Sequence, residues 1–256
     1  MQRVTAAIVN YNDLDSTRNA VHSLLQHTGE SSFRLYVVDN SPTDESAQLL
    51  RKEFPQIEVV RSPENKGFGA AHNLVLPLLD SEYHAVINPD IEIKTDVLLE
   101  LCGYFDKNPD VGIACPATYF PDGGIQLLPK IFPKVKYLLA SRLPFKSSKA
   151  LRTEYVMGNE DLTRVRDVQY VTGCFMFMRT SLFKRVGGFD ERYFLYFEDA
   201  DLTRMIMRHA RAVYYPYARV YHHWSRLGAK SPKYLLIQVS SMFKYFKKWR
   251  GNSKEL

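Results

Sequence analysis

The chain has 256 residues, of which 45% are hydrophobic and 24% charged, and its formal net charge is +6. This length suits one large α/β domain, or one domain with an appendage. There is no apolar run of the roughly 18 residues that a membrane-spanning helix needs, and no signal-peptide pattern at the start, so we expect neither. Cys102, Cys115 and Cys174 are widely spaced in apolar sequence, which predicts buried free thiols in a reducing, cytoplasmic compartment.

The positive charge is unevenly distributed. No acid occurs between Asp122 and Glu154, or from Arg204 to Lys254, while lysine and arginine recur in both stretches. The first stretch contains Lys130, Lys134, Lys136, Arg142, Lys146, Lys149 and Arg152. Such patches suit nucleic acid, anionic lipid or a phosphorylated ligand, and a merely solvated face is the alternative.

The first half of the chain alternates between predicted strands and helices. Buried strands are predicted at 4–11, 33–40, 57–62, 83–90 and 111–118. Helices are predicted at 14–27, from near Pro42, within 67–79 and at about 95–107. Alternation at this spacing is typical of a parallel, doubly wound sheet.

The second half is less regular. Residues 119–165 are rich in proline and lysine with weak periodicity, 168–180 predicts one or two buried strands, and 212–225 predicts short strands. A helix is expected from about residue 198.

The segment 231–250 predicts an amphipathic helix. Its apolar or aromatic stripe, at three- and four-residue spacing, consists of Tyr234, Leu235, Gln238, Met242, Tyr245, Phe246 and Trp249. The basic residues around the stripe are Lys233, Lys244, Lys247, Lys248 and Arg250. A basic amphipathic helix suits an anionic membrane surface, whereas docking against the domain or a dimer interface are the ordinary alternatives. The sequence leaves the oligomeric state open.

Polar residues follow the predicted strands. The strand before Asp90 ends at Pro89, because proline fixes its own φ and restricts the residue before it. Another strand ends at Asp39, and a glycine-bearing loop at 65–73 follows the third strand. In open α/β sheets, ligands bind beyond the carboxyl ends of the strands. One carboxylate could accept from a base or ribose and another could hold a metal, while tight turns and packing are the simpler alternatives.

The first strand ends in "NYND", without the glycine fingerprint of dinucleotide-binding proteins, and a P-loop is also absent. This argues against a dehydrogenase and a Walker-type NTPase. Further along, "YFEDADLTR" places Glu198, Asp199 and Asp201 at a predicted helix N-terminus, where the helix dipole favours acids and Asp201 could pair with Arg204.

Seven segments together resemble the family 2 glycosyltransferases, in particular the rhamnosyltransferase-like branch that builds bacterial O-antigen and cell-wall glycans. They are "AIVNYN", "VVDNSPTDES", "NKGFGAAHN", "INPD", "GCFMFMR", "GGFDERYFLYFEDADL" and "ARVYHH". The resemblance runs from about residue 3 to 224. It implies a GT-A fold, with a Rossmann-like, mostly parallel central sheet flanked by helices, and inverting transfer from a nucleotide-diphosphate sugar with Mg²⁺ or Mn²⁺.

The resemblance also assigns residues. Those implied to bind the nucleotide are Val9, Asn10, Tyr11, Asp39, Asn40, Lys66, Gly67, Phe68, Asn73 and Asn88. The residues implied to shape the donor and acceptor pocket are Gly173, Cys174, Phe194 and Asp201. For most aromatic residues near Phe194, packing in a second small core is the better interpretation.

The "INPD" segment lies where the family has its Asp-x-Asp element, so Asp90 would ligate the metal. Asn88 replaces the first acid, which makes a weaker site for a hard cation. His222 is the second implied metal contact, and only one of His222 and His223 should face the cleft because neighbouring strand residues point to opposite faces. Asp199 is the implied general base, with Glu198 as the fallback, since crowded acids raise a carboxyl pKa.

The resulting hypothesis is a glycosyltransferase domain over 1–228, with a nucleotide-sugar-binding half (1–118) and an acceptor-binding, catalytic half (119–228), followed by the basic helix at 229–256. The donor would be a dTDP- or UDP-linked sugar, for example L-rhamnose from dTDP-rhamnose. The acceptor would be a polyprenyl-diphosphate-linked glycan at the inner face of the cytoplasmic membrane.

Rival functions are a nucleotide-sugar pyrophosphorylase and a membrane-attached binding module without turnover. A pyrophosphorylase should carry a glycine-rich, basic signature after its first strand, and "NYND" is not one. No nucleic-acid partner is expected, because the basic segments lack a recognisable binding motif.

Overall fold

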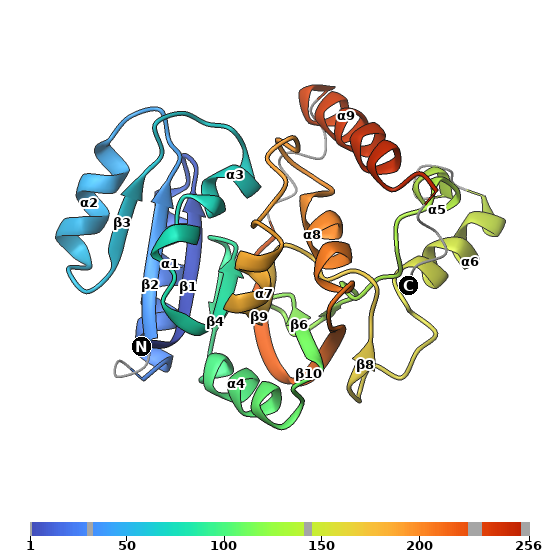
Figure 1. Cartoon of the computed structure of the whole chain (residues 1–256), viewed down its shortest axis with the longest axis horizontal. Helices are drawn as coiled ribbons and strands as arrows, with labels where there is room; N and C mark the ends of the chain where they lie inside the picture. Colours follow the sequence, from blue (N-terminus) through green and yellow to red (C-terminus); the bar gives the residue numbers. More distant parts are fainter. Residues whose placement is uncertain (1, 30–32, 141–144, 225–231, 252–256) are drawn as a thin grey trace.

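The computed structural model describes residues 2–29, 33–140, 145–224 and 232–251. Its strands form one ten-stranded sheet, with the order β3-β2-β1-β4-β9-β6-β10-β5, while β7 pairs with β6 and β8 with β10 (Figure 1). The strands are β1 (Gln2–Asn10), β2 (Phe33–Asp39), β3 (Glu58–Arg61), β4 (Ser81–Ile87), β5 (Ile91–Ile93), β6 (Val111–Tyr119), β7 (Ile125–Gln126), β8 (Arg166–Asp167), β9 (Phe175–Arg179) and β10 (Arg211–His222).

Nine α-helices and a short 3₁₀ helix are found among the described residues. They are α1 (Leu14–His27), α2 (Glu45–Glu53), α3 (Phe68–Asn73), the 3₁₀ helix η2 (Leu76–Leu78), α4 (Val97–Lys107), α5 (Val135–Ala140), α6 (Lys146–Tyr155), α7 (Thr180–Arg185), α8 (Glu198–Ile206) and α9 (Pro232–Lys248). The predicted C-terminal helix is therefore present as α9. No helix in the described ranges is long and apolar enough to cross a membrane.

The sheet is parallel through the first half and mixed in the second. Strands β3, β2, β1 and β4 are mutually parallel, and β6 is parallel to β10. β9 lies between β4 and β6 and is antiparallel to both. The first four residues of β9 are buried. An apolar run of this kind predicts a buried strand, but it does not predict the direction of the strand. The mostly parallel sheet expected from the sequence is therefore confirmed, and the antiparallel strand β9 joins its two halves.

Both faces of the sheet are buried, as expected for parallel strands covered by helices. Side chains of β1 alternate: Val4, Ala6 and Ile8 pack in one core cluster, and Ala7 and Val9 in another. The first cluster includes residues of α1, α2 and α4, and the second includes residues of α3, α7 and α8. Two helical layers thus hold the strand ends rigidly in place.

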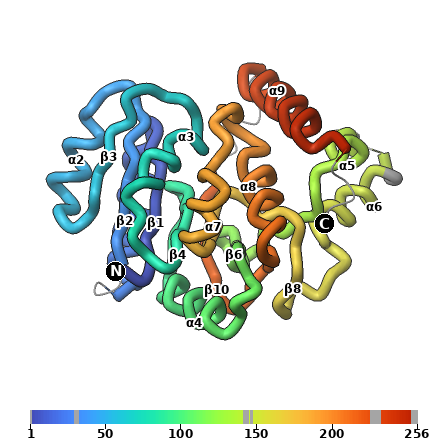
Figure 2. Tube along the Cα trace, in the orientation of Figure 1, coloured from blue at the N-terminus to red at the C-terminus, as the bar shows by residue number. Residues whose placement is uncertain are grey.

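A third, smaller cluster joins α9 to the domain. Tyr245 and Trp249 pack with Phe197, Ala200 and Tyr193. Figures 1 and 2 both show α9 lying across α8 and beside α5. The C-terminal helix is therefore docked against α8 and the segment that precedes it.

Three local predictions differ from the structure. α2 begins at Glu45, after a turn, and not near Pro42. The segment after residue 211 forms one long strand, β10, whose register shifts between Tyr215 and Arg219 around Pro216, because proline cannot donate to the ladder. A further strand, β5, follows Asp90 directly and pairs with β10.

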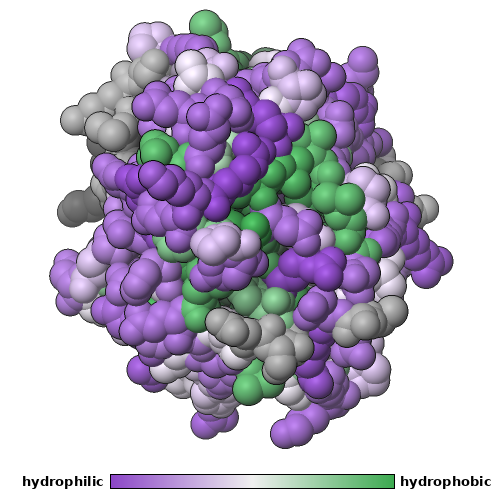
Figure 3. All heavy atoms as spheres, turned by 90° about the vertical axis from the view of Figure 1, so that its left-hand side faces the viewer, coloured by the Kyte–Doolittle hydropathy of each residue, from purple (hydrophilic) through white to green (hydrophobic). Residues whose placement is uncertain are grey.

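The surface on the α2 and β3 side is mostly hydrophilic, with hydrophobic atoms gathered across its middle (Figure 3). This agrees with α2, which buries Ala47 and Leu50 and turns most other side chains to solvent. All three cysteines are free and buried, as predicted.

Two histidines are buried near the centre of the molecule. His72 on α3 and His84 on β4 are both fully shielded from solvent. Both ring nitrogens of His72 lack a hydrogen-bond partner among the described residues, while Nδ1 of His84 lies 2.9 Å from Oγ1 of Thr5. Burial lowers the pKa of each histidine to about 3.

We expect the free energy of unfolding to fall as the pH drops from about 6.5 toward about 3. In this range the two histidines are protonated in the unfolded chain but stay neutral while they are buried in the folded protein. At pH 5 each buried histidine should cost about 2 kcal/mol relative to neutral pH. His72→Leu should flatten this dependence in denaturant titrations at pH 5 and pH 8, and the exposed His22→Leu serves as the control. An equal pH dependence in wild type and His72→Leu would contradict the prediction.

Candidate functional site

Two connected cavities lie beyond the carboxyl ends of β1, β2 and β4. The smaller has a volume of about 320 Å³ and the larger about 630 Å³. Both are lined by Phe68, Asn88, Asp90, Leu195 and Tyr234. The strand ends, the segment before α8 and the start of α9 therefore share one continuous binding region.

Asp199 lies on the wall of the larger cavity, in the first turn of α8. The hydroxyl of Tyr170 donates to its two carboxylate oxygens, at 3.0 Å and 2.9 Å. The backbone N–H of Gly173 donates to Oδ2 at 2.8 Å, and that of Ala200 donates to Oδ1 at 2.8 Å. These donors fix the orientation of a carboxylate that faces the cavity.

Glu198 lies beside Asp199 on the same cavity wall and is only 5% exposed. Its Oε2 has no hydrogen-bond partner among the described residues. Burial and the neighbouring charge of Asp199 raise the pKa of Glu198 well above its usual range. This direction favours the protonated form of Glu198.

The chain enters α8 in a strained conformation. Tyr196 and Phe197 both have a φ of 69°, in the left-handed region that bulky residues rarely adopt. The backbone carbonyl of Phe197 accepts from the N–H of Asp201 at 2.9 Å, so this turn leads directly into the helix. Strain of this kind persists where the surrounding structure holds it, often at functional sites.

Asp201 lies away from both cavities, in contrast to its predicted place in the substrate pocket. Two residues along a helix correspond to a rotation of about 200°, so Asp201 points away from the side of Asp199. Its Oδ2 accepts from Nζ of Lys248 at 2.6 Å, and its Oδ1 accepts from Nε1 of Trp249 at 2.7 Å. Asp201 therefore anchors the C-terminal helix, and its pairing with Arg204 stays a prediction.

Asp90 and His222 meet on the wall of the same larger cavity. Oδ1 of Asp90 lies 3.3 Å from Nε2 of His222, and neither atom has a hydrogen-bond partner among the described residues. The Gln126 amide donates to the His222 carbonyl at 2.9 Å, so its Oε1 faces Nδ1 of His222 at 3.0 Å as an acceptor. In the neutral imidazole, Nδ1 then carries the proton and Nε2 directs a lone pair toward Asp90. A cation between these two atoms would satisfy both.

His223 points to the opposite side of β10. Its Nε2 lies 3.0 Å from Oε2 of Glu92, and it lines a separate surface pocket. Of the two adjacent histidines, His222 is the one on the wall of the larger cavity.

Six of the predicted nucleotide-binding residues line the smaller cavity. They are Val9, Tyr11, Asn40, Gly67, Phe68 and Asn88. Nδ2 of Asn40 donates to Oδ1 of Asn65 at 2.9 Å, while Oδ1 of Asn40 is buried without a hydrogen-bond partner in the described chain. This free acceptor is available to a ligand.

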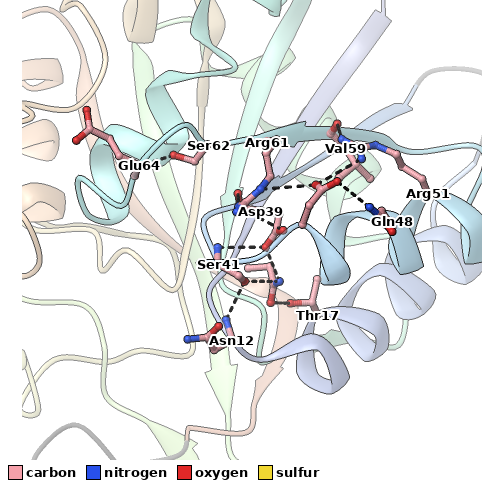
Figure 4. A network of polar contacts seen from close by, with 12 residues as sticks. Asn12, Thr17, Asp39, Ser41, Gln48, Arg51, Val59, Arg61, Ser62 and Glu64 are labelled. Atoms are coloured by element: carbon pink, nitrogen blue, oxygen red, sulfur yellow. Dashed lines mark hydrogen bonds and ion pairs between the residues drawn. The ribbon is translucent and has the colours of Figure 1, made fainter.

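Asp39 and Asn10 do not line this cavity and are fully buried. Figure 4 shows Asp39 within a network of polar contacts that includes Ser41 and Arg61. Oδ1 of Asp39 accepts from Nδ2 of Asn10 at 2.9 Å and from the N–H of Ser41 at 3.2 Å. Arg61 lies 3.5 Å from Oδ2 of Asp39, which itself makes no hydrogen bond within the described residues. These contacts brace the ends of β1 and β2, and binding of a base by Asp39 stays a prediction.

Three loop residues have structural contacts. Lys66 is exposed and pairs with Glu64 at 2.7 Å. The side chain of Asn73 donates to the carbonyl of Phe189 at 2.8 Å and accepts from its N–H at 2.8 Å, away from both cavities. Gly67 has a φ of 105°, and a Cβ there would lie 2.0 Å from the carbonyl oxygen of Phe194. The close approach that glycine permits is therefore made by the segment before α8.

The remaining predicted pocket residues divide between the cavities. Gly173 and Cys174 line the larger one, and Phe194 lines the smaller one. Burial raises the pKa of the Cys174 thiol to about 12, with a further contribution from Asp90, so this thiol is not an active nucleophile.

Sequence reasoning missed several cavity residues. Tyr170 and Lys130 line the larger cavity, and Lys233 and Ile237 of α9 line the smaller one. The signal for Tyr170 was weak, namely a tyrosine three residues before Gly173 in a buried segment. For Lys130, the stretch without acidic residues predicted that this region could bind an anionic ligand, but it did not single out Lys130.

Comparison with known proteins agrees with the predicted family. A family model described as Glycosyl transferase family 2 matches residues 5–187. N-acetylglucosaminyl-diphospho-decaprenol L-rhamnosyltransferase of Mycobacterium tuberculosis (strain CDC 1551 / Oshkosh) is 27% identical over 217 residues, covering 79% of this chain and 70% of that protein. Rhamnosyltransferase WbbL of Escherichia coli (strain K12) is 28% identical over 170 residues, covering 61% of each.

The fold also matches a solved structure. The crystal structure of GalNAc-T7 with UDP, GalNAc and Mn²⁺ superposes with a TM-score of 0.69 at 13% identity, over 98% of this chain and 48% of that one. This chain thus spans about half the length of that protein. At this identity the likeness concerns the fold alone, and the GT-A fold expected from the sequence is confirmed.

Proposed function

Because this chain belongs to glycosyl transferase family 2, in its rhamnosyltransferase-like part, we propose that it moves a sugar from a nucleotide-diphosphate donor to an acceptor hydroxyl with inversion. The observation that carries the proposal is a fixed carboxylate, Asp199, in one cavity with the Asp90–His222 pair. A general base at Asp199 and a diphosphate site at Asp90 and His222 within one cavity suit direct displacement of the nucleoside diphosphate by the acceptor hydroxyl. The names of these relatives suggest rhamnose as the transferred sugar, and we propose dTDP-rhamnose as its donor.

In the proposed reaction, Asp199 takes the proton of the acceptor hydroxyl while that oxygen attacks the anomeric carbon. The bond from this carbon to the donor phosphate breaks, and the nucleoside diphosphate leaves with the electron pair. Tyr170 and the Gly173 N–H hold the carboxylate for this role. Burial and the charge of Asp199 raise the pKa of Glu198, which favours its protonated form, so we assign the base to Asp199.

Asp199→Asn should lower kcat by about 10²- to 10⁴-fold, the contribution of a general base, and leave nucleotide affinity nearly unchanged. Glu198→Gln replaces one neutral group by another of the same shape, so we expect less than about a tenfold loss. Steady-state transfer assays with both variants test this pair. An active Asp199→Asn together with an inactive Glu198→Gln would assign the base to Glu198.

A divalent cation, Mg²⁺ or Mn²⁺, fits the pair of unpartnered atoms on Asp90 and His222, where oxygen and imidazole ligands are both acceptable to such ions. When bound, it would neutralise charge on the departing diphosphate. Gln126 holds the His222 ring in the tautomer that this requires. The smaller cavity, with Asn40 and Tyr11 on its wall, would hold the nucleoside.

Calorimetric titration with dTDP, UDP and GDP, with and without Mn²⁺, should show metal-dependent binding of one nucleotide. Asp90→Asn should weaken that binding by at least about tenfold, since it removes a ligand charge. Glu92→Gln, which changes an acid two residues further along in β5 that pairs with His223, is the matched control. Equal affinity with and without Mn²⁺ would contradict the metal site, and absence of all nucleotide binding would contradict the proposed function.

We further propose that the acceptor is a polyprenyl-diphosphate-linked glycan and that α9 contacts the anionic inner face of the cytoplasmic membrane. Leu235, Leu236 and Phe243 of α9 are 44%, 71% and 66% exposed. The exposed lysines on the same helix are Lys233, Lys244 and Lys247. Apolar side chains beside lysines suit anionic lipid, and Tyr234 on this helix lines both cavities, so a lipid-borne acceptor would arrive next to the site.

Replacing Leu236 and Phe243 together by glutamate should lower binding to phosphatidylglycerol vesicles by at least about tenfold, because apolar burial is lost and charge is reversed. Point changes are preferable to removal of α9, whose Tyr245 and Trp249 are part of the core. Leu99→Glu, an exposed leucine on α4, is the control in the vesicle sedimentation assay. Unchanged sedimentation would refute membrane contact, and a dimer lost in the double variant would assign this face to a subunit interface.

A further inference from the structure

Lys130 has an unusual position for a lysine of the acid-free stretch. It lies between β7 and α5, and its carbonyl accepts from the N–H groups of Gln169 at 3.1 Å and Tyr170 at 3.0 Å. This pairing places its half-buried side chain on the wall of the larger cavity. Lys134 and Lys149 of the same stretch are exposed, and Lys136 pairs with Glu154.

The ammonium group of Lys130 has no anion beside it. Nζ lies 4.8 Å from the ring centre of Tyr170 and 5.9 Å from that of Tyr155. Within the described parts of the chain, Nζ makes no hydrogen bond and no ion pair. Burial lowers its pKa, and the charge of Asp199 acts against that decrease. A partly desolvated cation that makes no direct ion pair would be stabilised by a bound anion.

The neighbours of Lys130 suggest which anion this is. The ring beneath its ammonium belongs to Tyr170, whose hydroxyl holds Asp199. The same cavity contains Asp90 and His222, where we place the donor diphosphate. An anion bound by Lys130 would therefore share one cavity with the proposed base and with the proposed diphosphate site. Such an anion would be part of a substrate. Ammonium groups are common ligands of phosphate oxygens.

We propose that Lys130 binds a phosphate group of a substrate in the larger cavity, an assignment that rests on the proposed function. The phosphate has two possible sources: the diphosphate that leaves with the nucleoside, and the diphosphate that links an acceptor sugar to its lipid. In the second case, the acceptor hydroxyl and its diphosphate would both reach into one cavity of about 630 Å³. The acceptor would then carry its diphosphate on the sugar that receives the transfer, or on the next one.

The test compares Lys130→Met with Lys134→Met. Both variants remove one lysine from the same stretch, but only Lys130 lines the cavity, so Lys134→Met controls for general attraction of anions. The first assay is calorimetric titration with dTDP and UDP in the presence of Mn²⁺. The second compares transfer to N-acetylglucosamine on a short polyprenyl diphosphate with transfer to its octyl glycoside, which has no phosphate.

If Lys130 binds the donor diphosphate, Lys130→Met should weaken nucleotide binding at least about tenfold, the usual loss for a charged hydrogen bond. If it binds the acceptor diphosphate, nucleotide binding should be unchanged. KM should then rise at least about tenfold for the diphosphate acceptor only, which removes the advantage of that acceptor over the octyl glycoside. Lys134→Met should match wild type throughout.

Equal behaviour of both variants in both assays would overturn the assignment and leave the proposed function intact. If the wild-type protein bound neither nucleotide and transferred no sugar, the proposed function and the assignment would fall together. Melting temperatures report whether Lys130→Met is folded. If it is not, Lys130→Gln and Lys130→Arg replace it, and only the arginine variant should keep the affinity for phosphate.

Discussion

The structure depends on how one helical turn buries three carboxyl groups. Glu198, Asp199 and Asp201 all lie in the first turn of α8 and are each less than a tenth exposed. Buried carboxyl groups must be paired, hydrogen-bonded or protonated. Each group meets this requirement in a different way: Asp199 accepts hydrogen bonds from a tyrosine and from backbone N–H groups, Asp201 accepts from Lys248 and Trp249, and Glu198 has a raised pKa, which favours its protonated form. The positions of α9, of the Tyr170 segment and of the cavity between them follow from these requirements.

The strands of the first half could be predicted from sequence because they are short, apolar and buried on both faces. The ends of β1, β2 and β4 could be inferred in the same way, which brought Asn40, Asn88 and Asp90 to one edge of the sheet. The direction of β9 could not, since a strand of four consecutive buried residues reads alike in either direction. Its insertion between β4 and β6 depends on the path of the chain through 119–165, where the sequence has weak periodicity.

The location of a site residue could be predicted where it depends on the position of that residue along one helix or strand. It was harder to predict where the site is formed by segments that are distant in the sequence. Helical rotation alone separates Asp201 from Asp199, yet the family resemblance had grouped them. The partners of Asp199 come from a segment 29 residues earlier, and Lys130 reaches the cavity only because its backbone pairs with that segment. Gly67 illustrates the same difficulty: the sequence suggested room for a ligand, and the room is taken by the carbonyl of Phe194.

The contacts between Asp201 and the end of α9 also affect the order in which parts of the chain can fold. Synthesis produces Asp201 well before Lys248 and Trp249, so a nascent chain carries the acidic turn of α8 without its counter-charge. Until α9 is synthesised and docks, burial of the Asp201 carboxylate is unfavourable, so this turn is expected to stay hydrated. The part of the wall that Tyr234 gives to both cavities is also missing until then. Assembly of the cavity therefore requires that the segment 232–249 has been synthesised and docked.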